Sequence, residues 1–273
     1  MKKESKQKGS RKSNPDLAES YLTFLGTQHL CQDGKMRQHA PTKLIDVFRQ
    51  VHLESQIKKP KYDLSACISG TDPDFKGRVL WLSDLHWFHE NIIKFVGHNK
   101  RPFENAEEMN SVILANILNT VSHEDIVIFV GDITFEKSED GTYPLTNAML
   151  REIRSRCAHM INVIGNHDVD KRNGVMKLGF DEVYSSLTLD FSGTPILVSH
   201  YPVDVATLDM IPGCINVHGH LHAHLWESPL LDSLYPADSN EFRHVSANLE
   251  TLTNLSPMTL NELIARPGPK VSL

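Results

Sequence analysis

Four histidines occupy every second position in one eight-residue stretch of the sequence. They are His218, His220, His222 and His224. Alternate residues of an extended chain point to the same side. The stretch is therefore either a surface strand with imidazoles on its outer face, or half of a metal site that needs carboxylates from elsewhere. Imidazole nitrogens are common metal ligands.

Side chains of the metal-binding kind also follow other short apolar runs of the sequence. The runs end at Leu82, Val130, Ile164, Val198 and Val217. They are followed in turn by Asp84 and His86; Asp132; Asn166, His167 and Asp168; His200; and His220 and His222. In open α/β sheets, ligands bind beyond the carboxyl ends of the strands. We therefore expect these five loops to converge at one edge of a sheet.

The spacing and number of these residues favour two metal ions. Asp84 and His86 are two residues apart, as are His220 and His222, so each pair can hold one cation from an extended segment. The glycines that precede several of these residues permit tight turns and a close approach. Seven Asp, Asn and His ligands, counted without His167 and Asp168, are too many for one tetrahedral ion and suit two ions that share a carboxylate. Two ions roughly 3.5–4 Å apart suit in-line attack on a phosphoryl group.

Strands and helices that would position these loops are visible in the apolar pattern. Continuous apolar runs predict strands buried on both faces at 79–82, 126–130, 161–164, 196–198 and 215–217. Asn105, with Glu108 three residues later, predicts the start of a helix over 106–120. Its expected apolar face contains Met109, Val112, Ile113 and Ile117. A last helix is expected over 259–265. Such alternation predicts a parallel or mixed sheet covered by helices.

Composition and length indicate one large domain with an N-terminal extension. The chain has 273 residues and a formal net charge of −6, so no global positive field recruits nucleic acid. We expect a disordered basic tail over 1–16, a partly helical extension over 17–62 and the main domain over 63–273. The tail either contacts nucleic acid or acidic lipid, or simply aids solubility. The scattered cysteines and the absence of a long apolar run predict a cytoplasmic protein with no membrane partner.

The ordered series of motifs resembles the calcineurin-like metallophosphoesterases. The matching motifs are Asp84-x-His86, Gly131-Asp132, Gly165-Asn166-His167-Asp168, His200 and Gly219-His220-x-His222. The resemblance runs from about residue 78 to 265 and is greatest to a small bacterial and phage-type subgroup. Phe88 stands where that subgroup tends to have glycine. The Asp-Arg-Gly of the protein Ser/Thr phosphatases does not follow Asp132, which argues against that branch.

This resemblance implies a fold and a set of ligands. The fold would be α/β (α+β), a four-layer αββα sandwich with two mixed β-sheets and the metals at the edge where the sheets meet. The first metal would be held by Asp84, His86 and His222. The second would be held by Asn166, His200 and His220, with Asp132 bridging the two. Two divalent ions are expected, with manganese first and iron or zinc as alternatives.

The resemblance also implies catalytic roles. A hydroxide between the metals would attack phosphorus, and His167 would protonate the leaving alkoxide or stabilise the phosphoryl oxygens. Asp168 would orient His167. His89 either lines the substrate pocket or begins a helix. Arg101 either contacts a substrate phosphate or forms a structural ion pair.

The leading functional hypothesis is a dinuclear metal-dependent hydrolase. It would act as a phosphatase or phosphodiesterase on a phosphorylated small molecule or a nucleotide. One alternative is a nuclease on the same scaffold, which the net acidity disfavours. Another is a non-catalytic metal-binding scaffold protein, whose sign would be degenerate ligands, and the motifs show none.

Overall fold

The computed structural model describes the main domain and little of the N-terminal extension. It describes residues 60–97, 100–139, 141–168, 177–203, 208–222 and 243–266, and the backbone of 29–30 and 36–37. The predicted tail over 1–16 and most of the extension over 17–62 lie outside these residues. Within the extension, β1 (His29–Leu30) pairs with β2 (Met36–Arg37) in antiparallel fashion.

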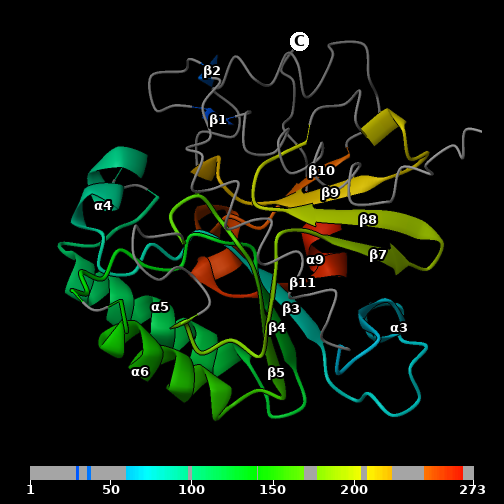
Figure 1. The fold of residues 1–273 in the computed structure, drawn as a ribbon, viewed down its shortest axis with the longest axis horizontal. Helices are drawn as coiled ribbons and strands as arrows, with labels where there is room; N and C mark the ends of the chain where they lie inside the picture. The colour runs from blue at the N-terminus through cyan, green and yellow to red at the C-terminus, as the bar shows by residue number, and fades with distance from the viewer. Residues whose placement is uncertain are drawn as a thin grey trace, which may run out of the picture.

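Five strands form the first sheet, in the order β11-β3-β4-β5-β6 (Figure 1). The strands are β3 (Val79–Leu82), β4 (Ile126–Phe129), β5 (His159–Val163), β6 (Glu182–Tyr184) and β11 (Met258–Thr259). The first four run parallel, and β11 pairs antiparallel with β3. Every residue of β3, β4 and β5 is buried, as the continuous apolar runs predict for strands covered on both faces.

Four strands form the second sheet, in the order β10-β9-β8-β7. They are β7 (Leu187–Phe191), β8 (Thr194–Ser199), β9 (Ile215–His218) and β10 (His244–Ser246). β7 and β8 are antiparallel, whereas β8, β9 and β10 run parallel. Both sheets therefore mix parallel and antiparallel pairs. The predicted α/β (α+β) class with two mixed β-sheets is confirmed.

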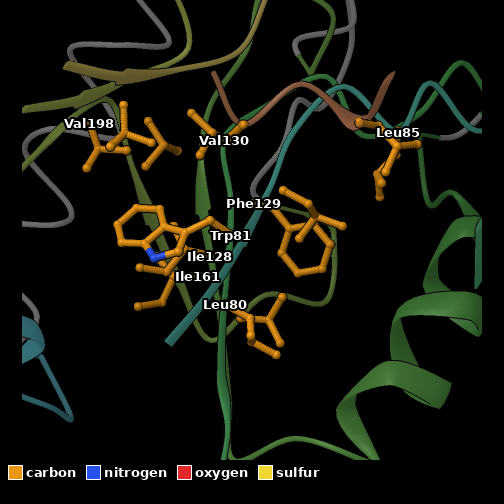
Figure 2. Packing of buried hydrophobic residues seen from close by; sticks show 14 of the residues in the cluster. Leu80, Trp81, Leu85, Ile128, Phe129, Val130, Ile161 and Val198 are labelled. Carbon is orange, nitrogen blue, oxygen red and sulfur yellow. The ribbon is translucent and has the colours of Figure 1, made fainter. Parts of the chain in front are cut away.

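The two faces of the first sheet pack against different parts of the fold. Trp81 pairs in register with Ile128, and Ile128 with Ile161. All three side chains point to the side where Val198 of the second sheet lies (Figure 2). Leu80 points to the opposite side of the sheet, as side chains on neighbouring strand positions must. The core thus lies partly between the sheets and partly between the first sheet and its helices.

Helices flank the sheets, and the long helix begins where the sequence predicts. They are α3 (Leu64–Ser69), α4 (Glu90–Val96), α5 (Ala106–Thr120), α6 (Pro144–Arg154) and α9 (Leu260–Ile264), with short 3-10 turns η3 (Leu249–Thr251) and η4 (Thr253–Leu255). The Asn105 side chain accepts a hydrogen bond from Glu108 N at 2.9 Å, which caps α5. Met109, Ile113 and Ile117 of α5 are buried, but Val112 is 38% exposed. The predicted apolar face is therefore narrower than expected.

The remaining helices complete the packing around the sandwich. α5 and α6 pack against each other on one side of the first sheet (Figure 1). α3 contacts β7, and α9 contacts β11, β3 and β10. A capping box between Thr259 and Glu262 starts α9, close to the predicted helix over 259–265. Within the described residues, no helix is both long and apolar enough to cross a membrane.

Shortening Ile128 to alanine should test the core between the sheets. Ile128 is fully buried, so Ile128→Ala should lower the free energy of unfolding by about 2–5 kcal/mol through lost burial and a cavity. Val112→Ala, at an exposed position of α5, should change it by less than about 0.5 kcal/mol. Urea unfolding followed by circular dichroism measures both. Equal effects of the two substitutions would contradict this packing.

Candidate metal centre

The loops that carry the predicted ligands leave the two sheets at the same place. Beyond β3 and β4, pairing continues as Asp84 N donates to Gly131 O at 2.9 Å. In the second sheet, Gly219 N donates to His200 O at 3.0 Å. Ser83 forms a bridge with Asn248, which joins the end of the first sheet to the segment after β10. The carboxyl ends of strands from both sheets therefore meet at one edge.

Asp84, His86 and His222 form the first candidate ligand group. One nitrogen or oxygen atom of each lies within 4.8 Å of the others, and all three residues are buried. Asp84 Oδ1 is 3.8 Å from His86 Nε2 and 3.6 Å from His222 Nε2. These distances are too long for good hydrogen bonds. They are close to the roughly 3.4 Å that separates two ligands bound tetrahedrally at about 2.1 Å from one ion.

Asp132, His200 and His220 form the second candidate group by the same criterion. His200 Nε2 lies 3.3 Å from Asp132 Oδ2. The Asn166 amide oxygen lies 3.1 Å from His200 Nε2 and 3.0 Å from His220 Nδ1, so Asn166 belongs to this group. Asp132 Oδ2 is also 3.5 Å from His86 Nε2. Asp132 thus lies between the two groups, and the seven predicted ligands come together.

One unsatisfied atom indicates that a ligand belongs here. His86 Nε2 is buried and has no hydrogen-bond partner among the described residues. Buried polar nitrogens in native proteins are nearly always paired with protein, water or an ion. The atom faces the carboxylates of both groups, so a cation held by Asp84 and Asp132 would satisfy it. The residues present therefore fit a pair of metal ions.

Backbone strain is concentrated in these ligands. Five of the seven have positive φ angles: Asp84 (61°), His86 (50°), Asp132 (56°), His220 (70°) and His222 (52°). Residues other than glycine rarely adopt this left-handed conformation, which costs of order 1–3 kcal/mol each. Such strain persists where the surrounding structure over-determines it, and it is typical of functional sites.

Two glycines allow the loops to approach as closely as they do. A Cβ atom on Gly165 would lie 2.3 Å from Asp132 Oδ1, and one on Gly219 would lie 2.0 Å from Ser83 Oγ. Any larger residue would displace a ligand or the residue beside it. The sequence expectation that glycines permit close approach is confirmed at both positions.

Opposite charges shift the pKa values of the ligands. Burial raises the pKa of the Asp84 carboxyl, but the His222 and His86 rings outweigh it and lower the pKa below its usual value. The Asp132 pKa falls well below its usual value because His200 and His167 outweigh burial. Burial likewise lowers the pKa of His200, but Asp132 raises it to about 10. The carboxylates are thus ionised at neutral pH, and a bound cation must displace protons from the imidazoles.

His167 lies at the outer edge of the candidate centre. Its backbone N–H donates to Asp132 Oδ1 at 2.8 Å, and its ring is exposed. The ring packs against Phe135, with centroids 4.7 Å apart. Desolvation by the surrounding protein lowers the pKa of His167 despite the nearby Asp132 carboxylate. The ring therefore lies beside the candidate ligands and is open to solvent.

Asp168 has a different role from the one predicted. Its buried carboxylate accepts hydrogen bonds from the backbone N–H groups of Ile133 (2.7 Å), Gly165 (2.7 Å) and Asp132 (3.1 Å). Among the described residues it makes no hydrogen bond to His167. Asp168 therefore ties the loop after β4 to the loop after β5, and the expectation that it orients His167 is corrected.

His89 begins a helix, as one of the two interpretations expects, and the suggestion that it lines a substrate pocket stays a prediction. It immediately precedes α4, although its side chain makes no capping hydrogen bond. Its ring stacks on Phe135 with centroids 3.7 Å apart, and its Nδ1 is 3.1 Å from His86 Nδ1. Burial and the nearby His86 lower its pKa to about 4. Phe88, which replaces the glycine of the resembling subgroup, has a φ of 64°, a conformation that glycine adopts without strain.

Arg101 forms a structural ion pair and does not face a substrate. It is fully buried, and its Nε donates to Glu250 Oε1 at 2.6 Å. The rest of the guanidinium donates to the backbone carbonyls of Leu85 (2.9 Å) and Asp84. The suggestion that Arg101 contacts a phosphate is therefore corrected, and the alternative of an ion pair holds.

Sequence reasoning missed Glu250, which lies beside the first ligand group. Its Oε1 is 3.0 Å from His222 Nδ1, and its side chain is fully buried. The sequence carried only a weak signal, because Glu250 follows the short strand β10 (His244–Ser246), which is not a continuous apolar run. Of the two unassigned histidines, His218 is buried outside both ligand groups, and burial together with His244 lowers its pKa to about 3. His224 lies outside the described residues.

Comparisons with known proteins support the fold and do not name an activity. No model of a known protein family matches the chain. The uncharacterized protein MJ1445 of Methanocaldococcus jannaschii is 29% identical over 188 residues, which cover 68% of this chain and 89% of that protein. The crystal structure of AQ665 from Aquifex aeolicus, titled a protein of unknown function, is similar with a TM-score of 0.52 and 27% identity. The similar region covers 69% of this chain and 98% of the AQ665 chain.

Replacing Asp168 should test its role in holding the loops. Asp168→Ala removes the acceptor of three backbone N–H groups, so it should lower the free energy of unfolding by about 3 kcal/mol or more and weaken metal binding. Asp125 is a matched control because it accepts from Arg78 N and Ser122 N away from the ligands. Asp125→Ala should destabilise the fold but leave metal binding intact. Wild-type stability and metal binding in Asp168→Ala would contradict this role.

Proposed function

We propose that the protein is a metal-dependent phosphoesterase of the calcineurin-like kind. Its substrate would be a phosphomonoester or phosphodiester of a small molecule or nucleotide. The observation that carries the proposal is the pair of ligand groups, buried except for the half-buried Asn166 and His220, with Asp132 between them. The order of the motifs along the chain supports it. The names of the similar proteins indicate no activity.

The residues present suit two divalent ions. Asp84, His86 and His222 would hold one ion, Asn166, His200 and His220 the other, and Asp132 would contact both. Carboxylate, amide and imidazole ligands favour manganese, with iron or zinc as alternatives. Bound ions would supply positive charge that activates water and neutralises phosphoryl oxygens.

The protein itself would position the two metal ions and provide a proton donor. Asp132 fixes the spacing of the two groups, because one carboxylate oxygen lies near both His86 and His200. The exposed His167 ring would approach the phosphate from solvent. An anionic phosphate favours the protonated imidazole. Protonated His167 would then give its proton to the leaving alkoxide, whereas a neutral ring would still donate one N–H to a phosphoryl oxygen.

Two chromogenic esters test the proposed activity. With manganese, the protein should hydrolyse p-nitrophenyl phosphate or bis(p-nitrophenyl) phosphate, and EDTA should abolish turnover. Asp132→Asn should reduce turnover at least about 100-fold, because it removes the charge shared by the two groups. Asp190→Asn, at an exposed position within β7, is a control that should keep full activity. Turnover that survives both EDTA and Asp132→Asn would refute the proposal.

The ester that reacts assigns the reaction more closely. Turnover of the monoester alone would indicate a phosphatase. Turnover of the diester alone would indicate a phosphodiesterase or nuclease. Silence on both esters, in protein loaded with two ions, would favour the non-catalytic metal-binding scaffold.

Substitution of His167 tests the proton donor. His167→Asn should lower kcat by about 100-fold or more and remove one limb of the pH–rate profile, while metal content stays unchanged. His123→Asn changes an exposed histidine before β4, at the opposite end of the strand from the ligands, and should have no effect. An unchanged kcat in His167→Asn would remove His167 from the mechanism.

A further inference from the structure

A buried ion pair lies directly behind the first ligand group. Arg101 comes from the segment between α4 and α5, and Glu250 comes from η3, after β10. Neither side chain is exposed, and Arg101 Nε lies 2.6 Å from Glu250 Oε1. The pair therefore joins two segments that are 149 residues apart in the chain.

Both members of the pair also contact the ligands or their backbone. Glu250 Oε1 lies 3.0 Å from His222 Nδ1. Arg101 donates to the carbonyl of Leu85 at 2.9 Å and to the carbonyl of Asp84. The pair thus connects the loop that carries Asp84 to the loop that carries His222. Together these two loops carry all three residues of the first ligand group.

The contact to Glu250 selects one form of the His222 ring. A carboxylate accepts a hydrogen bond, so the proton of the neutral ring must lie on Nδ1. The lone pair is then on Nε2, the atom that lies 3.6 Å from Asp84 Oδ1. Carboxylates placed in this way behind metal-binding histidines fix the tautomer and orientation of the ring and increase its basicity.

Fold stability alone does not explain why the pair is buried. Buried ion pairs can often be replaced by apolar residues of similar volume without loss of stability. The second ligand group uses a neutral partner for the same purpose, since His200 Nδ1 lies 2.7 Å from the carbonyl of Val130. Glu250 therefore places a full negative charge, held by Arg101, behind a single ligand of the first group.

We propose that Glu250 is a positioning residue for the metal held by Asp84, His86 and His222, and that Arg101 holds Glu250 in place. The inference rests on the proposed two-metal site and assigns to Glu250 the orientation of His222. Among the described residues, neither Asn166 nor His200 forms a hydrogen bond or ion pair with Arg101 or Glu250, so the two ions should respond differently to loss of the pair.

Metal binding to the full-length protein tests this role without any assay of activity. Glu250→Gln keeps the size of the side chain and removes its charge. It should weaken binding of one of two Mn²⁺ ions by roughly 10- to 100-fold in calorimetric titrations and leave the other within about twofold. The visible absorption of the Co²⁺-loaded protein should change, because that spectrum reports ligand geometry.

A second carboxylate–histidine pair provides a matched control. Glu182 Oε1 lies 2.7 Å from His159 Nε2 at the far end of the first sheet, outside the candidate centre. Glu182→Gln should keep both ions and the wild-type Co²⁺ spectrum, even if it lowers stability. Glu250→Asp retains the charge beside Arg101 but is one carbon shorter, so it should also weaken one ion.

The outcomes separate this inference from the proposed function. Wild-type affinity and spectrum in whichever Glu250 variant retains the wild-type far-UV circular dichroism would overturn the positioning role. Selective loss of one ion would support it, even if the wild-type protein hydrolyses neither ester. Hydrolysis of an ester by the wild type with no selective loss in the variants would leave the phosphoesterase proposal intact and refute the role of Glu250.

Discussion

The candidate centre depends on two buried carboxylates that share a small space. Asp84 and Asp132 are almost completely buried, and the nearby His222 and His86 rings lower the pKa of Asp84 although burial and the charge of Asp132 oppose them. Buried like charges are costly unless cations compensate them. Without metal, protonated imidazoles provide that compensation, as the raised pKa of His200 indicates. Bound cations would replace the protons, so the same carboxylates that oppose a compact site without metal favour it when metal is bound.

The fold brings these charges together through its strand directions. β3, β4 and β5 run parallel, as do β8, β9 and β10, so their carboxyl ends collect at one edge of each sheet. The bridge between Ser83 and Asn248 then joins the two edges. The apolar layer between the sheets, which includes the fully buried Trp81, packs the two sheets together. Such a scaffold can hold the strained ligand backbones in place.

The residues of the candidate centre can be predicted from the sequence because each signal is local. An apolar run, a glycine and a ligand-type residue lie within a few positions of one another, as at Val130, Gly131 and Asp132. The strands and the capped start of α5 follow from equally local patterns. The supporting contacts are not local: the partner of Arg101 is 149 residues away. The prediction that Asp168 orients His167 was wrong for a related reason. The backbone groups that Asp168 binds depend on how two loops pack together, which the local sequence does not show.

The supporting residues show how the centre tolerates its own strain. Asp168 binds three backbone N–H groups around Asp132, and Arg101 binds the carbonyls of Asp84 and Leu85. Both side chains thus hold the backbone beside residues with positive φ angles. The φ/ψ strain is therefore offset by charge-assisted hydrogen bonds to the same segments. Those bonds come from the protein's own side chains, so they support the backbone of the candidate ligands independently of the proposed metal ions.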